Sequence, residues 1–244
     1  MQLVKKAKVR NEQRLFVVEG TKMFAEANRE WVQQVYVSES FLLLDKNKAL
    51  LSDVKYEVLT DHVFKTVSDT QTPQGILSLL TMPSYTLSDI LKQPNPQLLI
   101  LESIQDPGNL GTMFRTGEGA GIAGVIMNRT TVDVFNPKTI RSTMGSIYRV
   151  PFLVAENLKD TITDIKAQGV TLYAAHLKGK CSYDEVDYKT ATGFLIGNEG
   201  NGLSDEIAEL ANSYIRIPMA GKVESLNAAI AATLLMYEAA RQRR

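Results

Sequence analysis

The run LLILESI (residues 98–104), followed by DPGNLGTMFRTGEGAG (106–121), decides how the second half of this chain folds. The first run is a nearly continuous apolar stretch, typical of a strand that is covered on both faces. The second run opens with turn residues and continues as a helical pattern. A buried strand that leads through a short turn into a helix predicts a unit of a parallel α/β sheet.

Four later runs have the same strand-like character and complete the predicted sheet. They are GVIMN (124–128), VTLYAA (170–175), TGFLIGN (192–198) and SYIRIPM (213–219). Helical segments separate them, so the sheet should be mostly parallel. Such sheets bind ligands beyond the carboxyl ends of their strands. Three runs begin at such ends and become the candidate site: 106–121, LIGNEGNGLS (195–204) and IRIPMAGKVESLNAAIAATLLMYEAARQ (215–242).

The first third of the chain predicts a smaller α/β unit. Its strands are RLFVV (14–18), VQQVYVS (32–38), YEVLT (56–60) and GILSLL (75–80), with helical patterns at 21–29 and 61–68. Pro83, Pro94 and Pro96 then interrupt any regular element. We therefore predict a domain over 1–82, a linker over 83–96 and a second domain over 97–244.

Composition narrows the classes of function. Among 244 residues, 27 Lys and Arg balance 27 Asp and Glu, so the net charge gives no reason to expect a nucleic-acid partner. Basic side chains nevertheless gather near the N-terminus: Lys5, Lys6, Lys8, Arg10 and Arg14. Such a run is usually a solvated face, so it gives only weak support for a phosphate-rich partner. One cysteine and two histidines predict a reducing cytoplasm and no metal site. No apolar stretch approaches the roughly 18 to 20 residues that span a bilayer.

Two of the three runs carry polar groups among turn residues. In LIGNEGNGLS, glycines permit tight turns around Glu199. In the last run, Ser225 is the predicted N-cap of a helix, and Asn227 is a residue that favours caps over helix interiors. Apolar residues then recur with a period of 3.6 from Leu226 to Tyr237. That stripe fits either a helix buried in the core or a helix in a dimer interface.

The first run carries Asn109 and Arg115, six positions apart, which we expect to come back toward one face of a helix. An arginine suits a phosphate ligand, although a solvated surface arginine is an equal alternative. Gly119, Gly121 and Gly124 match the spacing of a dinucleotide fingerprint. They follow a helix and precede a strand, the reverse of what that fingerprint requires, which argues against a nicotinamide dehydrogenase.

Asn109 with Arg115, then GNEG (197–200), then IPM (217–219) leading into SLN (225–227), resemble in this order the three signature motifs of the SpoU, or TrmH-like, RNA 2'-O-ribose methyltransferases of the SPOUT superfamily. The opening KKAKVRNEQRLFVVEGTKMFAEA (5–27) resembles the start of the family's ribosomal-protein-like RNA-binding domain. The resemblance implies an α/β SPOUT domain with a mostly parallel sheet and a deep trefoil knot, preceded by a small α/β RNA-binding domain.

The resemblance also implies S-adenosyl-L-methionine as cofactor and assigns roles to residues. The cofactor would be surrounded by Gly197, Glu199, Gly200, Ile217, Pro218, Met219, Leu226 and Ala229, with His176 and Leu177 as a further wall. The catalytic group would be Arg115, Asn109, Glu199, Ser225 and Asn227. Arg115 would bind the target phosphate and polarise the hydroxyl, because a guanidinium remains protonated and is a poor base.

The implied function is transfer of a methyl group to a ribose 2'-hydroxyl, in ribosomal RNA rather than transfer RNA. The partners implied are RNA and a second copy of the chain, bound through the SPOUT domain, with no DNA and no membrane. Three alternatives stay open: a transfer RNA ribose methyltransferase, a methyltransferase acting on a base nitrogen, and a catalytically silent RNA-binding member of the fold. The presence of all five catalytic side chains argues against the silent member.

Overall fold

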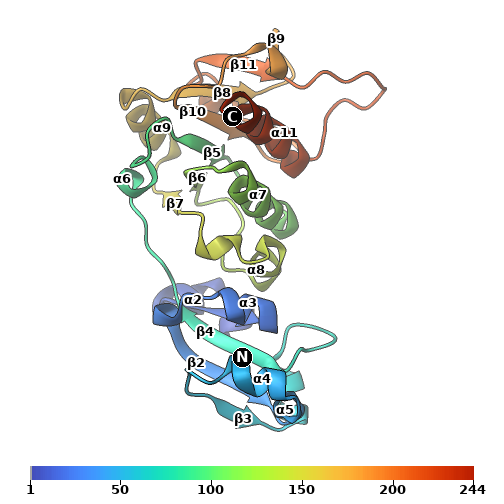
Figure 1. The fold of residues 1–244 in the computed structure, drawn as a ribbon. Helices are drawn as coiled ribbons and strands as arrows, with labels where there is room; N and C mark the ends of the chain where they lie inside the picture. The colour runs from blue at the N-terminus through green and yellow to red at the C-terminus, as the bar shows by residue number, and fades with distance from the viewer. Residues whose placement is uncertain (1) are drawn as a thin grey trace. The chain divides into compact units, whose positions relative to one another are not determined.

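The computed structural model describes residues 2–244, which form two compact units. The first unit holds the chain up to Pro83 together with Asp133–Tyr148, and the second holds Ser84–Val132 and Arg149–Arg244 (Figure 1). The sequence predicted two consecutive domains, over 1–82 and 97–244. In the structure, residues 133–148 belong to the first unit although they lie within the second predicted domain. Because each unit has its own sheet and core, the two are described separately.

The first unit is built on a four-stranded sheet in the order β1-β4-β2-β3. Its strands are β1 (Leu15–Glu19), β2 (Val32–Ser38), β3 (Glu57–Leu59) and β4 (Ile76–Thr81). β4 runs antiparallel to both β1 and β2, and β3 runs parallel to β2. Its helices are α1 (Gln2–Lys5), α2 (Ala7–Gln13), α3 (Thr21–Glu26), α4 (Asp45–Leu50), α5 (Asp61–Val67) and α8 (Pro137–Thr143). The four strands predicted in this region are confirmed.

Arg10 does not have the exposed position that an RNA contact needs. It is 3% exposed, and its Nη1 donates to the carbonyls of Leu3 and Val4 at 2.7 and 3.1 Å. Its Nε donates to the Asp133 carboxylate at 3.0 Å. A buried guanidinium needs such a set of partners to offset its lost hydration. The expectation that Arg10 binds RNA is therefore corrected: it holds α2 against the returning segment 133–148.

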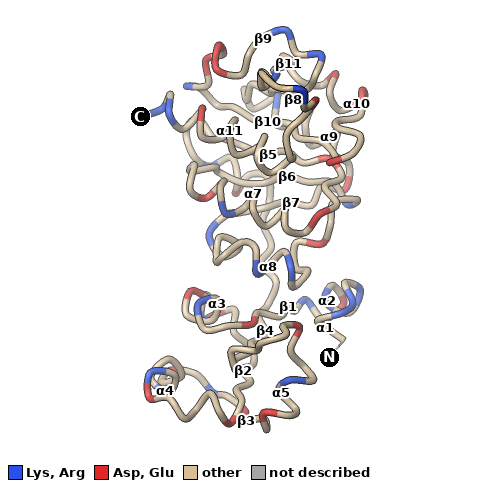
Figure 2. The backbone as a smooth tube through the Cα atoms, turned by 90° about the vertical axis from the view of Figure 1, so that its right-hand side faces the viewer, with Lys and Arg blue, Asp and Glu red and all other residues tan. Residues whose placement is uncertain are grey.

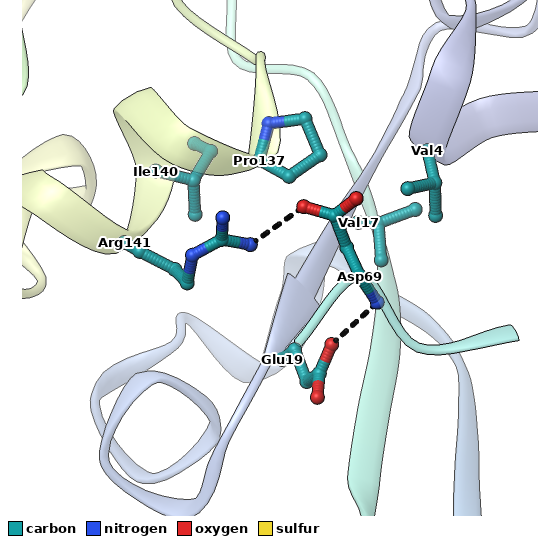
Figure 3. A pocket seen from close by; sticks show the side chains of 7 residues that line it. All are labelled: Val4, Val17, Glu19, Asp69, Pro137, Ile140 and Arg141. Carbon is teal, nitrogen blue, oxygen red and sulfur yellow. Dashed lines mark hydrogen bonds and ion pairs between the residues drawn. The ribbon is translucent and has the colours of Figure 1, made fainter. Parts of the chain in front are cut away.

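The same returning segment lines a small cavity of the first unit (Figure 3). Arg141 of α8 points toward Asp69 and donates to its Oδ2 at 2.9 Å. The amide of Asp69 in turn donates to Glu19 of β1 at 3.2 Å. With a volume near 10 Å³, about that of one water-sized probe, this cavity is too small for a ligand.

The second unit is built on a seven-stranded sheet in the order β7-β6-β5-β10-β8-β11-β9, in which every neighbouring pair is parallel. Its strands are β5 (Gln97–Leu101), β6 (Gly124–Asn128), β7 (Phe152–Ala155), β8 (Thr171–Ala175), β9 (Cys181–Ser182), β10 (Thr192–Ile196) and β11 (Ser213–Arg216). Every residue of the central strands β5 and β10 is buried, as their apolar runs predict. The edge strands β7 and β9 are short, and the sequence did not indicate them.

Helices cover both faces of this sheet. They are α6 (Leu87–Ile90), α7 (Pro107–Ala120), α9 (Leu158–Ala167), α10 (Asp205–Ala208) and α11 (Ala228–Gln242). α6, α9 and α10 pack on one face through residues such as Ile90, Ile162 and Ile207. α7 and α11 lie beside each other on the opposite face (Figure 1). No helix among residues 2–244 is long and apolar enough to cross a bilayer.

The buried face of α11 is not the predicted apolar stripe. Its buried residues are Ala228, Ala229, Ala232, Leu235, Met236 and Ala239, so small side chains let the helix lie close to α7 and the sheet. Ile230, Leu234 and Tyr237 are instead 49%, 36% and 43% exposed. Within one chain, these three side chains therefore lie outside the core.

The C-terminal segment returns across the sheet after β11. β11 pairs with β8, whereas α11 contacts β10, β5 and α7 on the other side of β8. Buried Gln97 at the start of β5 donates from Nε2 to the Met236 carbonyl at 2.9 Å, which fixes the helix over the sheet. The return path suits the expected trefoil knot, and the knot itself stays a prediction.

Candidate active site at the carboxyl edge of the sheet

Four adjacent strands of the second unit end at one edge of the sheet. β5, β10, β8 and β11 are neighbours and parallel, so the loops that follow them leave from the same side. These loops contain the segments 102–106, 197–204, 176–180 and 217–227. The three runs with unusual polar residues, and His176 with Leu177, are thus gathered at one edge.

The glycine loop after β10 is closed tightly on itself. The amides of Asn198 and Gly202 donate to each other's carbonyls at 3.0 and 2.9 Å. A Cβ on Gly197 would lie 2.1 Å from the backbone carbon of Gly202 and from the nitrogen of Leu203, so only glycine fits there. The side-chain Oδ1 of Asn198 accepts from the amides of Gly200 and Asn201 at 2.8 and 3.1 Å. The loop is therefore a fixed frame for Glu199.

Glu199 links this loop to the start of α7. Its Oε2 accepts from the amide of Gln105 at 3.0 Å, and its Oε1 accepts from the amide of Asp106 at 3.1 Å and from Nδ2 of Asn109 at 3.0 Å. Partial burial raises the pKa of Glu199, but these hydrogen bonds outweigh it and lower the pKa overall. Glu199 is thus an ionised acceptor with three donors, suited to holding the two segments together.

Asn109 lies between Asn227 and Glu199 in a series of side-chain hydrogen bonds. Its Oδ1 accepts from Nδ2 of Asn227 at 2.9 Å, while its own Nδ2 donates to Glu199. Asn227 is the N-cap of α11, because its Oδ1 accepts from the amides of Ala229 and Ile230 at 2.9 and 3.3 Å. Asn227, Asn109 and Glu199 therefore connect the beginnings of α11 and α7 with the glycine loop.

Ser225 does not have the position predicted for it. It is exposed and lies two residues before the cap, so the prediction that it caps α11 is wrong. Both residues have good capping side chains, and the chain enters the helix only at Ala228, which gives the cap to Asn227. Ser225 lies in the loop that precedes α11.

Arg115 stands apart from this hydrogen-bonded chain. Six residues on an α-helix turn the side chain about 120° away from that of Asn109, so the expectation of one shared face is wrong. Among residues 2–244, Arg115 is exposed and makes no hydrogen bond or ion pair. The next residue, Thr116, faces α11 and bonds Thr233 at 2.9 Å. The Arg115 guanidinium is thus available to a group outside this chain.

The segment after β11 offers a lining suited to a mixed apolar and polar ligand. Ile217, Met219 and Leu226 are half-buried, Pro218 is exposed, and Ala229 is buried at the start of α11. Within the described chain, the amides from Met219 to Leu226 make no backbone hydrogen bond. Partly exposed apolar side chains beside free peptide groups are typical of sites that bind a small ligand with both apolar and polar parts.

His176 and Leu177 follow β8 at the same edge. Nδ1 of His176 accepts from the amide of Lys178 at 3.0 Å, and its ring lies 5.2 Å from that of Tyr214, centre to centre. Leu177 is 69% exposed. The His176 ring is therefore held in place by the Lys178 amide and the Tyr214 ring. No group of His, Cys, Asp and Glu side chains suited to a metal ion occurs among residues 2–244.

Ser103 and Asn128, which the sequence did not indicate, support the site from the ends of β5 and β6. Ser103 has a left-handed backbone, φ 58°, and its amide donates to Oδ1 of Asn128 at 2.9 Å. The Ser103 carbonyl accepts from Nδ2 of Asn198 at 2.8 Å. Asn128 at the end of β6 therefore holds a strained turn to which the glycine loop is tied. In the sequence, the only indication of this contact is the polar residue Asn128 at the end of an apolar strand.

Replacing Asn227 separates the two functions of its side chain. Asn227→Ala removes the cap of α11 and is expected to lower the free energy of unfolding by about 1 kcal/mol. Asn227→Asp keeps the capping acceptor, so stability should stay near wild type, but it cannot donate to Asn109. Urea denaturation and methyl-transfer rates measured in parallel check this. Equal activity of Asn227→Asp and wild type would contradict the role of the Asn227–Asn109 bond.

Comparison with known proteins identifies the family of this chain. The family model described as the SpoU rRNA Methylase family matches residues 96–237, and an MRM3-like substrate binding domain matches residues 1–78. The chain is 33% identical over 233 residues to the 23S rRNA (guanosine(2553)-2'-O)-methyltransferase RlmP of Bacillus subtilis, covering 94% of this chain and 90% of that protein.

Two solved structures have the same fold over nearly the whole chain. The SpoU methyltransferase AviRb from Streptomyces viridochromogenes in complex with AdoMet has a TM-score of 0.90 at 27% identity, covering 99% of this chain and 95% of AviRb. The AdoMet-bound rRNA methyltransferase from Sinorhizobium meliloti has a TM-score of 0.87 at 33% identity, covering 98% and 92%. The chain therefore belongs to the SpoU rRNA methylase family, with the fold of the SPOUT superfamily.

Proposed function

We propose that this chain transfers a methyl group from S-adenosyl-L-methionine to a ribose 2'-hydroxyl of ribosomal RNA, in the cytoplasm. The observation that carries the proposal is the hydrogen-bonded chain from Asn227 through Asn109 to Glu199, which joins all three motif loops at one edge of the sheet. As a member of its family, the chain is an S-adenosylmethionine-dependent RNA methyltransferase. RlmP, a relative that acts on 23S rRNA, favours ribosomal over transfer RNA.

The cofactor fits the residues at this edge. The backbone of the glycine loop, at Gly197, Glu199 and Gly200, would hold it on one side, and Ile217–Met219 with Leu226 and Ala229 would hold it on the other. When bound, the sulfonium supplies an electrophilic methyl group. His176 and Leu177 would close the wall at the end of β8. The free amides and half-buried apolar side chains described above support this assignment.

Arg115 would bind the phosphate beside the target ribose and polarise the 2'-hydroxyl. Its planar guanidinium presents parallel donors to phosphate oxygens and keeps its proton. Glu199 is a poor general base, because its pKa is lowered and Asn109 and two amides already occupy its oxygens. The hydroxyl proton would therefore pass to an RNA phosphate or to water. Asn109 and Asn227 position the loops, and Ser225 contacts the ribose.

We also propose that the enzyme is a homodimer through α7 and α11. The exposed side chains Ile230, Leu234 and Tyr237 form an apolar face on α11. A Cβ on Gly119 would lie 2.6 Å from the Tyr237 hydroxyl, so this face continues onto α7 one turn after Arg115. A second copy that covers the face would approach Arg115 as well. Each active site would then draw on both chains.

Leu234→Glu is expected to shift the protein from dimer to monomer, because a charge would enter the centre of the apolar face. Sedimentation equilibrium at micromolar concentration measures the mass. Val154→Glu is the matched control, since Val154 is 44% exposed on β7, away from α11. A wild type that sediments as a monomer, or a Leu234→Glu variant that remains dimeric, would contradict the proposed interface.

The RNA contacts of the first unit are proposed for Lys5, Lys6, Lys8 and Arg14, all of which are exposed. Lys8 lies 3.8 Å from Glu12, an exposed pair that contributes little to stability and leaves the ammonium accessible. Arg10 is excluded from this set by its burial. These side chains would bind phosphates and thus supply affinity without reading sequence.

Isothermal titration of the purified chain with S-adenosylmethionine tests the cofactor site. We expect binding to one site per chain and a loss of affinity in Ile217→Asp, which places a charge in the proposed apolar lining. A circular dichroism spectrum shows that each protein is folded. A folded wild type that releases or absorbs no heat would count against the proposed function.

A further inference from the structure

The edge of the second sheet opposite the active site carries a separate cavity of about 470 Å³. It lies where strands begin rather than end: Gln97 starts β5, Lys189 precedes β10, and Gly121 precedes β6. The C-terminal end of α11 completes it with Arg243 and Arg244. Its lining comes entirely from the second unit, and none of the proposed methyl-transfer residues belongs to it.

The lining of this cavity is basic. Lys189, Arg243 and Arg244 line it, and none of its lining residues is acidic. Within the described chain, the side chains of Lys189 and Arg244 are exposed and have no carboxylate partner. Arg241 lies on α11 outside the cavity and does have a carboxylate partner, because Glu238 pairs with it at 2.7 Å. Figure 2 shows this basic end of the chain at the C-terminus of α11.

Helix ends do not neutralise these three cations. Gly121 is the C-cap of α7 and Arg243 is the C-cap of α11, and both line the cavity, so two helix C-termini lie beside it. Each carries roughly half a negative charge, so the two offset about one cation. Asp187, the nearest carboxylate along the chain from Lys189, accepts the amide of that residue at 2.9 Å. Among the lining residues themselves there are three cations and no carboxylate side chain, so the side-chain charge of the lining is positive.

Arg243 is fixed as a rigid donor. Its Nε donates to the carbonyl of Tyr188 at 2.8 Å, its Nη1 to the carbonyl of Asn95 at 2.9 Å, and its Nη2 to the carbonyl of Thr190 at 2.5 Å. These bonds use three of its five N–H groups and stop the side chain from turning away. The carbonyl partners bear no formal charge, so the positive charge of Arg243 is not cancelled.

We infer that this cavity binds the phosphate and ribose backbone of the RNA substrate, at a point distinct from the methyl-transfer site. The chain has no net charge, so its affinity for a polyanion must come from local groups such as these. Gln93 and Asn95 in the lining add uncharged polar groups that suit ribose hydroxyls. The inference rests on the proposed RNA substrate and extends the surface that RNA covers.

The test is the salt dependence of RNA binding by the full chain. Dissociation constants for a 23S rRNA transcript are measured between about 50 and 200 mM salt, for wild type and for Lys189→Ala/Arg244→Ala. The double variant should bind several-fold more weakly at low salt, and its slope of log affinity against log salt should be smaller by about one to two. The turnover number at saturating RNA should stay at the wild-type value.

The control is Lys159→Ala/Arg241→Ala, which removes the same charge from cations that Glu206 and Glu238 already pair. Its slope should match wild type. Equal slopes for both double variants would overturn the inference, as would inorganic phosphate that binds at Lys189 without competing with RNA. Failure of the proposed function would instead show as a wild type that transfers no methyl group, whatever the binding slopes are.

Discussion

Replacing Arg115 by alanine is expected to lower the turnover number for methyl transfer on the order of 10²- to 10³-fold, the effect of removing one preorganised hydrogen-bond donor from a reacting oxygen. Arg115 makes no hydrogen bond or ion pair within residues 2–244, so its loss should leave the stability of the monomer unchanged. Affinity for S-adenosylmethionine should also remain, because no proposed cofactor contact involves this side chain. Single-turnover rates and calorimetric titration measure the two quantities separately.

Arg115→Lys is the matched variant. It keeps the charge but lacks the planar fork that binds two phosphate oxygens, so its rate should lie between those of wild type and Arg115→Ala. A near-normal turnover number for Arg115→Ala would remove this residue from catalysis. A loss of cofactor affinity equal to the loss of rate would instead assign Arg115 to binding.

Gly197→Ala is expected to abolish cofactor binding and to lower the free energy of unfolding by about 1–3 kcal/mol, as overpacking does in a closed site. The added Cβ would lie 2.1 Å from two backbone atoms of the loop that returns at Gly202 and Leu203. Backbone cannot turn aside as a flexible side chain can, so the loop must open. Glu199 would then leave the amides of Gln105 and Asp106.

Gly200→Ala is the control within the same loop. The nearest atom to its added Cβ is Oδ1 of Asn198 at 3.4 Å, an ordinary contact, and its φ is not in the left-handed region. This variant should unfold at nearly the wild-type temperature, which separates the effect of the backbone clash from that of an added methyl group in the loop. If Gly197→Ala bound the cofactor as tightly as wild type does, the closed loop would not be needed for binding.

The elements of the fold followed from apolar runs where those runs were long and buried. β5 and β10 are buried throughout, and their sequences LLIL and TGFLI leave few other interpretations. β7 and β9 were missed because short edge strands carry no such run. The return of residues 133–148 to the first unit depends on Arg10, Asp133 and other partners far apart in sequence, which periodicity does not register.

The sequence predicted which residues belong to the candidate site, but not how they are arranged in space. Asn109, Glu199 and Asn227 were identified by motif order, and the structure joins them. The positions of Ser225 and Arg115 differed from the prediction, because the residue at which α11 begins is set by packing, and six helical residues do not return to one face. The sequence left open whether the apolar stripe of α11 lies in the core. In the structure four alanines are buried together with Leu235 and Met236, whereas Ile230, Leu234 and Tyr237 are exposed.

The most direct test of the account is to locate the transferred methyl group. The purified chain is incubated with isotope-labelled S-adenosylmethionine and a 23S rRNA transcript, and the digested nucleosides are identified by mass spectrometry. The account predicts label in a single 2'-O-methylated nucleoside and none with Arg115→Ala at the same time point. Label on a base nitrogen, or no label in RNA from an enzyme that binds the cofactor, would contradict it.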